Sequence, residues 1–155
     1  MPSRREVLKQ SASVAAMLMA AGVLPRVASA QSASWNAQAF DAKSVADVMK
    51  ALGASAPVES KEVSFQGPDI AENGAVVPIG ISTALPGVKR VAFLVEKNPN
   101  TLAAAFDLTP AVEPAINTRV KMAESSNVYA VAMLNDGRVL YAKKEIKVTL
   151  GGCGG

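Results

Sequence analysis

The sequence contains no histidine and only one cysteine, Cys153. Without histidine, the chain lacks the commonest general base and the commonest metal ligand near neutral pH, which argues against independent catalysis. A lone cysteine cannot form an internal disulfide in any compartment, so any disulfide must join this chain to another molecule.

The chain also lacks a surplus of positive charge outside its first thirty residues. The formal net charge of +3 comes from Arg4, Arg5, Lys9 and Arg26 against Glu6, which leaves 12 basic and 12 acidic side chains in residues 31–155. Because phosphate recognition needs a surplus of lysine and arginine, this balance argues against nucleic-acid binding.

No apolar run is long enough for a typical membrane span. The longest, at residues 11–24, falls short of the roughly 20 residues that a spanning helix needs. It follows the Arg4-Arg5 pair and precedes Ala28-Ser29-Ala30, an order typical of a cleaved signal peptide. We therefore expect residues 1–30 to be a signal peptide, with a retained membrane anchor as the alternative.

The arginine pair, followed by Leu8 and Lys9, resembles a twin-arginine signal, although such a pair also occurs in general secretory signals. The twin-arginine route exports folded proteins, so we expect a periplasmic protein exported with a folded partner. Met17 and Met19 would leave with the signal, and the remaining methionines form no cluster that suggests copper transfer.

Half of the residues are hydrophobic, which is enough for one folded domain at residues 31–150. Apolar residues at helical spacing predict one helix within Trp35–Leu52, with Asp41 or Ser44 as N-cap and Gly53 as its end.

Beyond Pro57 the sequence pattern predicts short strands separated by turn residues. The Asn135-Asp136-Gly137 sequence is the strongest hairpin signal, and in the last strand we expect Ile146, Val148 and Leu150 to face inward. The predicted strands are Glu62–Gln66, Ala75–Ile81, Val88–Glu96, Leu102–Leu108, Asn117–Met122, Val128–Leu134 and Val139–Leu150. They predict a mainly β protein, an immunoglobulin-like antiparallel β-sandwich with an N-terminal helix.

The last strand is followed directly by a glycine arm, residues 151–155, that carries the cysteine. Gly151, Gly152, Gly154 and Gly155 surround Cys153, and glycine gives the freest and narrowest backbone. Five residues extend at most about 17 Å, at roughly 3.3–3.6 Å each. The arm is therefore predicted to be flexible and suited to carrying sulfur into a narrow channel of another protein.

No Lys, Arg or His lies close in sequence to Cys153. An unperturbed thiol is only a few per cent thiolate at neutral pH, which suits an attachment site that other enzymes load and unload. The alternatives are a disordered tail, a cysteine that cross-links two chains, an enzyme that acts without partners, or activation of the terminal Gly154-Gly155 carboxylate as in ubiquitin-like sulfur carriers. Export argues against the last of these.

The chain resembles the SoxY family, the cysteine-bearing subunits of the SoxYZ carrier in the periplasmic thiosulfate-oxidising Sox system. The resemblance covers nearly the whole chain, and its most specific motif is Val148–Gly155. The other segments that carry it have no assigned chemistry: Pro68–Gly74 with Val77-Pro78, Glu96-Lys97-Asn98-Pro99-Asn100, and Thr118-Arg119-Val120-Lys121-Met122-Ala123.

The resemblance implies that Cys153 is the covalent attachment site for thiosulfate-derived sulfur. It implies a SoxZ-like subunit as heterodimer partner, a c-type haem SoxAX-like protein that loads the thiol, and a SoxB-like hydrolase that removes sulfate. In some organisms a SoxCD-like sulfane dehydrogenase would also act. We expect no catalytic residue, metal or cofactor in the chain itself, and neither nucleic acid nor membrane as partner.

Three other groups are weaker candidate sites. Arg119 and Lys121, two apart on a predicted strand, share one face that either guides an anionic cargo or is a solvated or subunit-contact face. Asp69 and Glu72 lie in a predicted turn, and two carboxylates alone are weak evidence for a cation site. The lysines Lys143, Lys144 and Lys147 either influence docking or protect an edge strand from aggregation.

Overall fold

The computed structural model describes residues 4, 6 and 36–151. Cys153 and three arm glycines, Gly152, Gly154 and Gly155, lie outside the described residues. So do Met17, Met19 and nearly all of the predicted signal peptide.

Two short helices, α2 (Ala37–Asp41) and α3 (Val45–Ala51), replace the single predicted helix. Each has its own N-cap: the Asn36 side chain accepts from the Ala39 N–H at 3.0 Å, and the Ser44 hydroxyl accepts from the Asp47 N–H at 3.1 Å. Side-chain caps of this kind stabilise the beginning of a helix, so two caps favour two helices. The predicted end at Gly53 is confirmed, since this residue has a φ of 64° just beyond α3.

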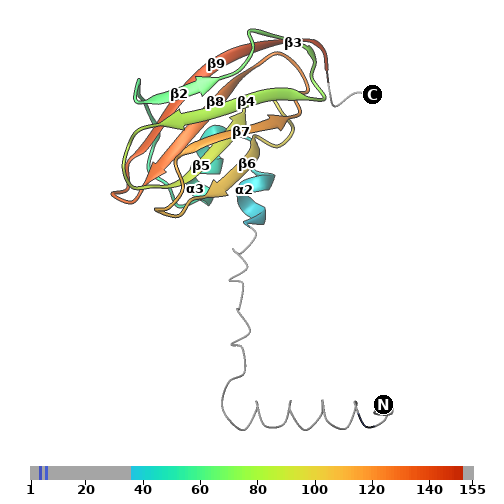
Figure 1. Cartoon of the computed structure of the whole chain (residues 1–155). Coiled ribbons are helices and arrows are strands. Elements are labelled where there is room, and N and C mark those ends of the chain that lie inside the picture. Colours follow the sequence, from blue (N-terminus) through green and yellow to red (C-terminus); the bar gives the residue numbers. More distant parts are fainter. Residues whose placement is uncertain (1–3, 5, 7–35, 152–155) are drawn as a thin grey trace. The chain divides into compact units, whose positions relative to one another are not determined.

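The strands form two sheets (Figure 1). The larger sheet has the order β1-β9-β8-β5-β6, with β3 also pairing with β9, and the smaller has the order β2-β4-β7. The bounds are β1 Val58–Glu59, β2 Val63–Gln66, β3 Ile70–Asn73, β4 Val77–Thr83, β5 Val88–Val95, β6 Leu102–Asp107, β7 Ala115–Val120, β8 Ser126–Leu134 and β9 Val139–Leu150.

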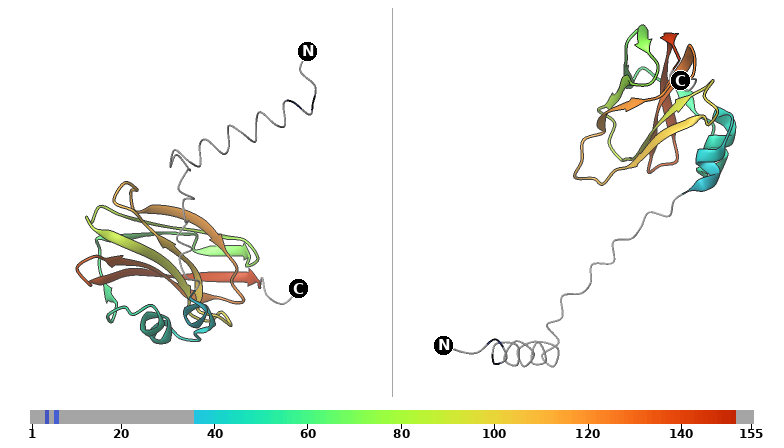
Figure 2. Two further views of the ribbon diagram at one scale, coloured as in Figure 1. Left: turned by 90° about the horizontal axis from the view of Figure 1, so that it is seen from below. Right: turned by 90° about the vertical axis from the view of Figure 1, so that its right-hand side faces the viewer.

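The core has two parts because β5 and β8 are covered on both faces. Alternate residues of β5, including Phe93, are buried between the two sheets, whereas Leu94 packs in a second cluster with Val48 and Met49 of α3. Figure 2 accordingly shows the helices on one side of the sandwich. The result is three layers, with the larger sheet in the middle.

The predicted β-sandwich with helical structure before it is confirmed, and β9 has the predicted bounds. The two strands that the prediction omitted, β1 and β3, both pair with β9 in parallel, whereas the other strand pairs are antiparallel. Among the described residues, no helix is long and apolar enough to cross a membrane.

Candidate functional site

Strand β9 leads directly to the cysteine arm, so the last residues before Cys153 define the candidate site. We call residues 147–151 the arm root. The pairing of β8 with β9 ends at Ser126 opposite Ile146, which means that β9 continues past its main neighbour. The expectation that Leu150 is buried is wrong, because this side chain is 66% exposed at the far end of the strand.

On one side, β3 supports the arm root. Ala71 lies opposite Val148 and Asn73 opposite Leu150, and the Gly74 N–H donates to the Leu150 carbonyl at 2.7 Å. The Thr149 hydroxyl adds a hydrogen bond of 2.8 Å to the Glu72 carbonyl. Figure 1 shows β3 and the end of β9 together at one end of the sandwich.

On the other side, where β8 has ended, residues 123–125 lie next to the arm root. The Ser125 hydroxyl accepts from the Val148 N–H at 2.9 Å. Further along, Gly151 lies so close to the Ala123 carbonyl oxygen that a Cβ on Gly151 would clash with it. The arm root therefore has neighbours on both sides up to the last described residue.

The side chain of Asn98 holds the segment that contacts Gly151. Its amide nitrogen donates to the Lys121 carbonyl at 2.7 Å, and its amide oxygen accepts from the Ala123 N–H at 2.9 Å. The sequence predicts a turn at Asn98-Pro99-Asn100 but no function for Asn98 or Ser125. Asn98 also lies within the Glu96–Asn100 segment that carries the family resemblance.

The two candidate carboxylates next to β9, Asp69 and Glu72, have different surroundings. Asp69 forms an ion pair with Lys144 at 2.7 Å, and the hydrogen bond from that lysine lowers the pKa of the Asp69 carboxyl below its usual value. Glu72 contributes its backbone carbonyl to Thr149. Across the residues that the structure describes, no cluster of acidic, histidine or cysteine side chains suits a metal ion.

The three candidate lysines of β9 differ in their surroundings. Lys144 is half-buried and also donates to the Gly67 carbonyl at 2.8 Å, whereas Lys143 and Lys147 are more open to solvent. The interpretation of β9 as an edge strand is wrong, because it pairs with β8 on one side and with β1 and β3 on the other. Lys144 therefore ties β9 to the segment before β3.

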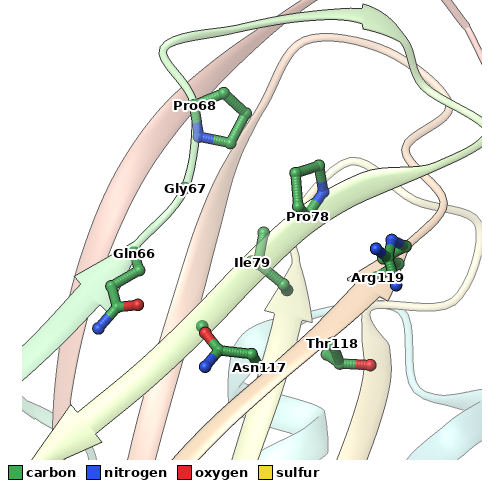
Figure 3. Close-up of a pocket in the computed structure, with 9 residues that line it drawn as sticks. Gln66, Gly67, Pro68, Pro78, Ile79, Asn117, Thr118 and Arg119 are labelled. Atoms are coloured by element: carbon green, nitrogen blue, oxygen red, sulfur yellow. The ribbon is translucent and has the colours of Figure 1, made fainter.

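Arg119 and Lys121 are both exposed, while the intervening Val120 is buried, as the alternation predicts. Arg119 lines a hollow of about 420 Å³ on the smaller sheet, together with Asn117 and Pro78 (Figure 3). This hollow lies over β2, β4 and β7, and none of its lining residues belongs to the arm root. Among the hydrogen bonds and ion pairs of the described residues, none joins the side chain of Arg119 or Lys121 to residues 147–151.

Comparison with known proteins identifies the family to which the domain carrying this site is similar. The family model described as "Sulfur oxidation protein SoxY" matches residues 48–153, a range that ends on the only cysteine. A comparison with curated proteins found no significant match.

Solved structures include the sulfur carrier protein SoxY from Chlorobium limicola f thiosulfatophilum. It is 31% identical, with a TM-score of 0.59, and the match covers 66% of this chain and 93% of that one. A variant of the superoxide reductase (neelaredoxin) from Ignicoccus hospitalis is 18% identical with a TM-score of 0.50, covering 56% and 78% of the two chains. That second likeness shows the fold alone.

The family match spans most of the chain, and the SoxY structure shares both sequence and fold with it. The chain therefore belongs to the SoxY family of sulfur oxidation proteins.

Proposed function

We propose that this chain is a periplasmic sulfur carrier that holds thiosulfate-derived intermediates covalently on Cys153 while partner enzymes oxidise and hydrolyse them. The observation that carries the proposal is the end of the family match, which extends through the arm root to Cys153. Because Cys153 is the only cysteine, no other thiol competes for the role.

Loading joins the Cys153 sulfur to the outer sulfur of thiosulfate. The thiol loses one proton and the new sulfur–sulfur bond releases two electrons, which a c-type haem SoxAX-like protein accepts. A SoxB-like hydrolase then adds water to the terminal sulfonate, breaks its bond to sulfur, and releases sulfate and two protons. A persulfide anion is left on Cys153.

The remaining sulfur leaves by a second oxidation. A SoxCD-like sulfane dehydrogenase removes six electrons and six protons while three water molecules supply oxygen, which gives a sulfonate on the Cys153 sulfur. A second hydrolysis releases sulfate and one proton and restores the thiol. In this cycle the chain needs no base or metal of its own, because the partners carry out each reaction.

A SoxZ-like subunit completes the carrier as a heterodimer in this proposal. The Arg4-Arg5 pair and the apolar run after it support export by the twin-arginine route. That route handles folded proteins, which fits export of the two subunits together under one signal.

The test is an intact mass of the mature chain, purified natively from thiosulfate-exposed cells with and without reductant. We expect a chain that begins at Gln31 and carries sulfur-containing mass increments that reductant removes. A Cys153→Ser variant is the matched control, because it differs by one atom and retains the arm. Only unmodified thiol or a homodimer disulfide, with thiosulfate oxidation intact in the variant, would refute the proposal.

A further inference from the structure

Four segments that carry the family resemblance meet at the arm root, although they are far apart in sequence. Gly74 ends the first, Asn98 lies in the second, Ala123 ends the third, and Gly151 lies in the fourth. Their contacts form a continuous path from Leu150 around to Gly151.

The path begins at Gly74, which bridges two segments through its backbone. Its N–H donates to the Leu150 carbonyl at 2.7 Å, and its carbonyl accepts from the Met122 N–H, also at 2.7 Å. Gly74 is buried, so these hydrogen bonds are shielded from competing water. The residue immediately before Gly151 is thus tied to the residue immediately before Ala123.

The Asn98 side chain fixes the next part of the path. Its two hydrogen bonds, to the Lys121 carbonyl and from the Ala123 N–H, bracket Met122, whose side chain is fully buried. The backbone of residues 121–123 therefore has little freedom to rotate. The Ala123 carbonyl oxygen is directed at Gly151.

Gly151 closes the path because it has no Cβ. Any other residue would place its Cβ against the Ala123 carbonyl oxygen, and that atom belongs to the backbone that Asn98 and Gly74 hold. A backbone atom cannot move aside as a flexible side chain can. The need for glycine here is close packing, which differs from the chain flexibility for which glycine is commonly placed in an arm.

We propose that Gly74, Asn98, Ala123 and Ser125 form a collar that seats Gly151 and fixes the position and direction in which the chain leaves the sandwich. This inference rests on the proposed function of Cys153 as sulfur carrier. In this proposal Gly151 is held as part of the folded sandwich. The four residues of the collar are positioning residues for the transfer of sulfur.

The collar shortens the reach of the thiol. If Gly151 were free, the Cys153 Cα could lie about 10 Å beyond Leu150, whereas it lies at most about 7 Å beyond a fixed Gly151, at roughly 3.3–3.6 Å per residue. A partner enzyme must therefore bring its reactive group close to the collar itself. In this proposal such a partner approaches the surface around Asn98, Ala123 and Ser125, which are partly exposed.

Gly151→Ala and Gly152→Ala are the matched pair that tests the collar, because they add the same methyl group one residue apart. Each is prepared as the full carrier, and a second set carries nitroxide labels on Cys153 and on an introduced cysteine at the exposed position Lys61. Three quantities are measured: the distance distribution between the labels, the rate of Cys153 alkylation by iodoacetamide, and the turnover of thiosulfate oxidation with the reconstituted partners.

We expect Gly151→Ala to shift the label distance and to lower turnover by up to about 100-fold, the loss that a misplacement of about 1 Å can produce. Gly152→Ala should leave the mean distance unchanged and lower turnover less than about threefold. Alkylation rates should stay equal in all variants, because the thiol itself is unaltered. Asn98→Ala is a second route to the same effect, since it releases Ala123 without changing the arm.

Equal distances and equal turnover in the two glycine variants, or wild-type behaviour of both Gly151→Ala and Asn98→Ala, would overturn the collar. These outcomes are separate from failure of the carrier function. That function fails if Cys153→Ser sustains thiosulfate oxidation, whatever the label distances show.

Discussion

Replacing Asn98 with alanine should destabilise the protein, and the size of the effect follows from its contacts. The side chain makes two hydrogen bonds to the backbone, of 2.7 and 2.9 Å, across a sequence separation of 23 and 25 residues. Each such bond contributes about 0.5–1.5 kcal/mol to stability. Because Asn98 is partly exposed, water can form hydrogen bonds with the Lys121 carbonyl and the Ala123 N–H after the substitution, which offsets part of the lost stability.

We therefore expect Asn98→Ala to lower the free energy of unfolding by about 1–2 kcal/mol, and the urea midpoint by roughly 0.5–1 M. Equilibrium unfolding in urea, followed by circular dichroism, measures both quantities. The slope of the transition should not change, since the substitution leaves the buried surface almost intact.

Asn100→Ala is the matched control because it removes the same side chain two residues away. The Asn100 amide oxygen accepts only from Lys43 among the contacts described, at an exposed position, so its loss should change stability by less than about 0.5 kcal/mol. Equal midpoints for Asn98→Ala and Asn100→Ala would refute the reasoning that Asn98 holds residues 121–123 in place.

Three further predictions concern the body of the carrier. Gly137→Ala should destabilise the β8–β9 hairpin by roughly 1 kcal/mol, because Gly137 has a φ of 89°; an unchanged melting temperature would contradict this. Met49→Ala should lower the free energy of unfolding in urea by about 2–5 kcal/mol because Met49 of α3 is part of the core, whereas exposed Lys50→Ala should have little effect. Asp69→Asn should lower the melting temperature slightly at pH 7, and the difference from wild type should disappear as the pH falls through the lowered pKa of Asp69, where the wild-type carboxyl also becomes neutral. A difference that persists at lower pH would exclude the ion pair with Lys144 as its cause.

Strand β9 was predictable with its full length because its signals are local. The Asn135–Gly137 turn fixes where it begins, and alternation of apolar and charged residues continues to its end. The helical segment was less predictable, since its apolar spacing spans both helices and only the caps at Asn36 and Ser44 divide it.

Strands β1 and β3 were missed for a different reason. They have only two and four residues, and the β3 sequence Ile-Ala-Glu-Asn has weak strand propensity. Both form because β9 offers unpaired backbone groups on the side away from β8, which is a property of the assembled sheet. The collar was missed for the same reason, because its hydrogen bonds join residues that no local pattern connects.

A carrier of this type needs a cysteine that can move between partners and a tether whose origin is fixed. In our proposal the fixed origin is Gly151, and the residues after it supply the movement. A short tether raises the effective concentration of the thiol at a docked partner only if its origin is fixed, because a moving origin enlarges the volume over which the thiol is spread. Hydrogen bonds with Gly74 and Ser125 fix Leu150 and Val148 on opposite sides, and the close contact with Ala123 extends this to Gly151. The smallest residue is thus needed at Gly151 for rigidity, so the adjacent glycines of one motif are expected to respond differently to the same substitution.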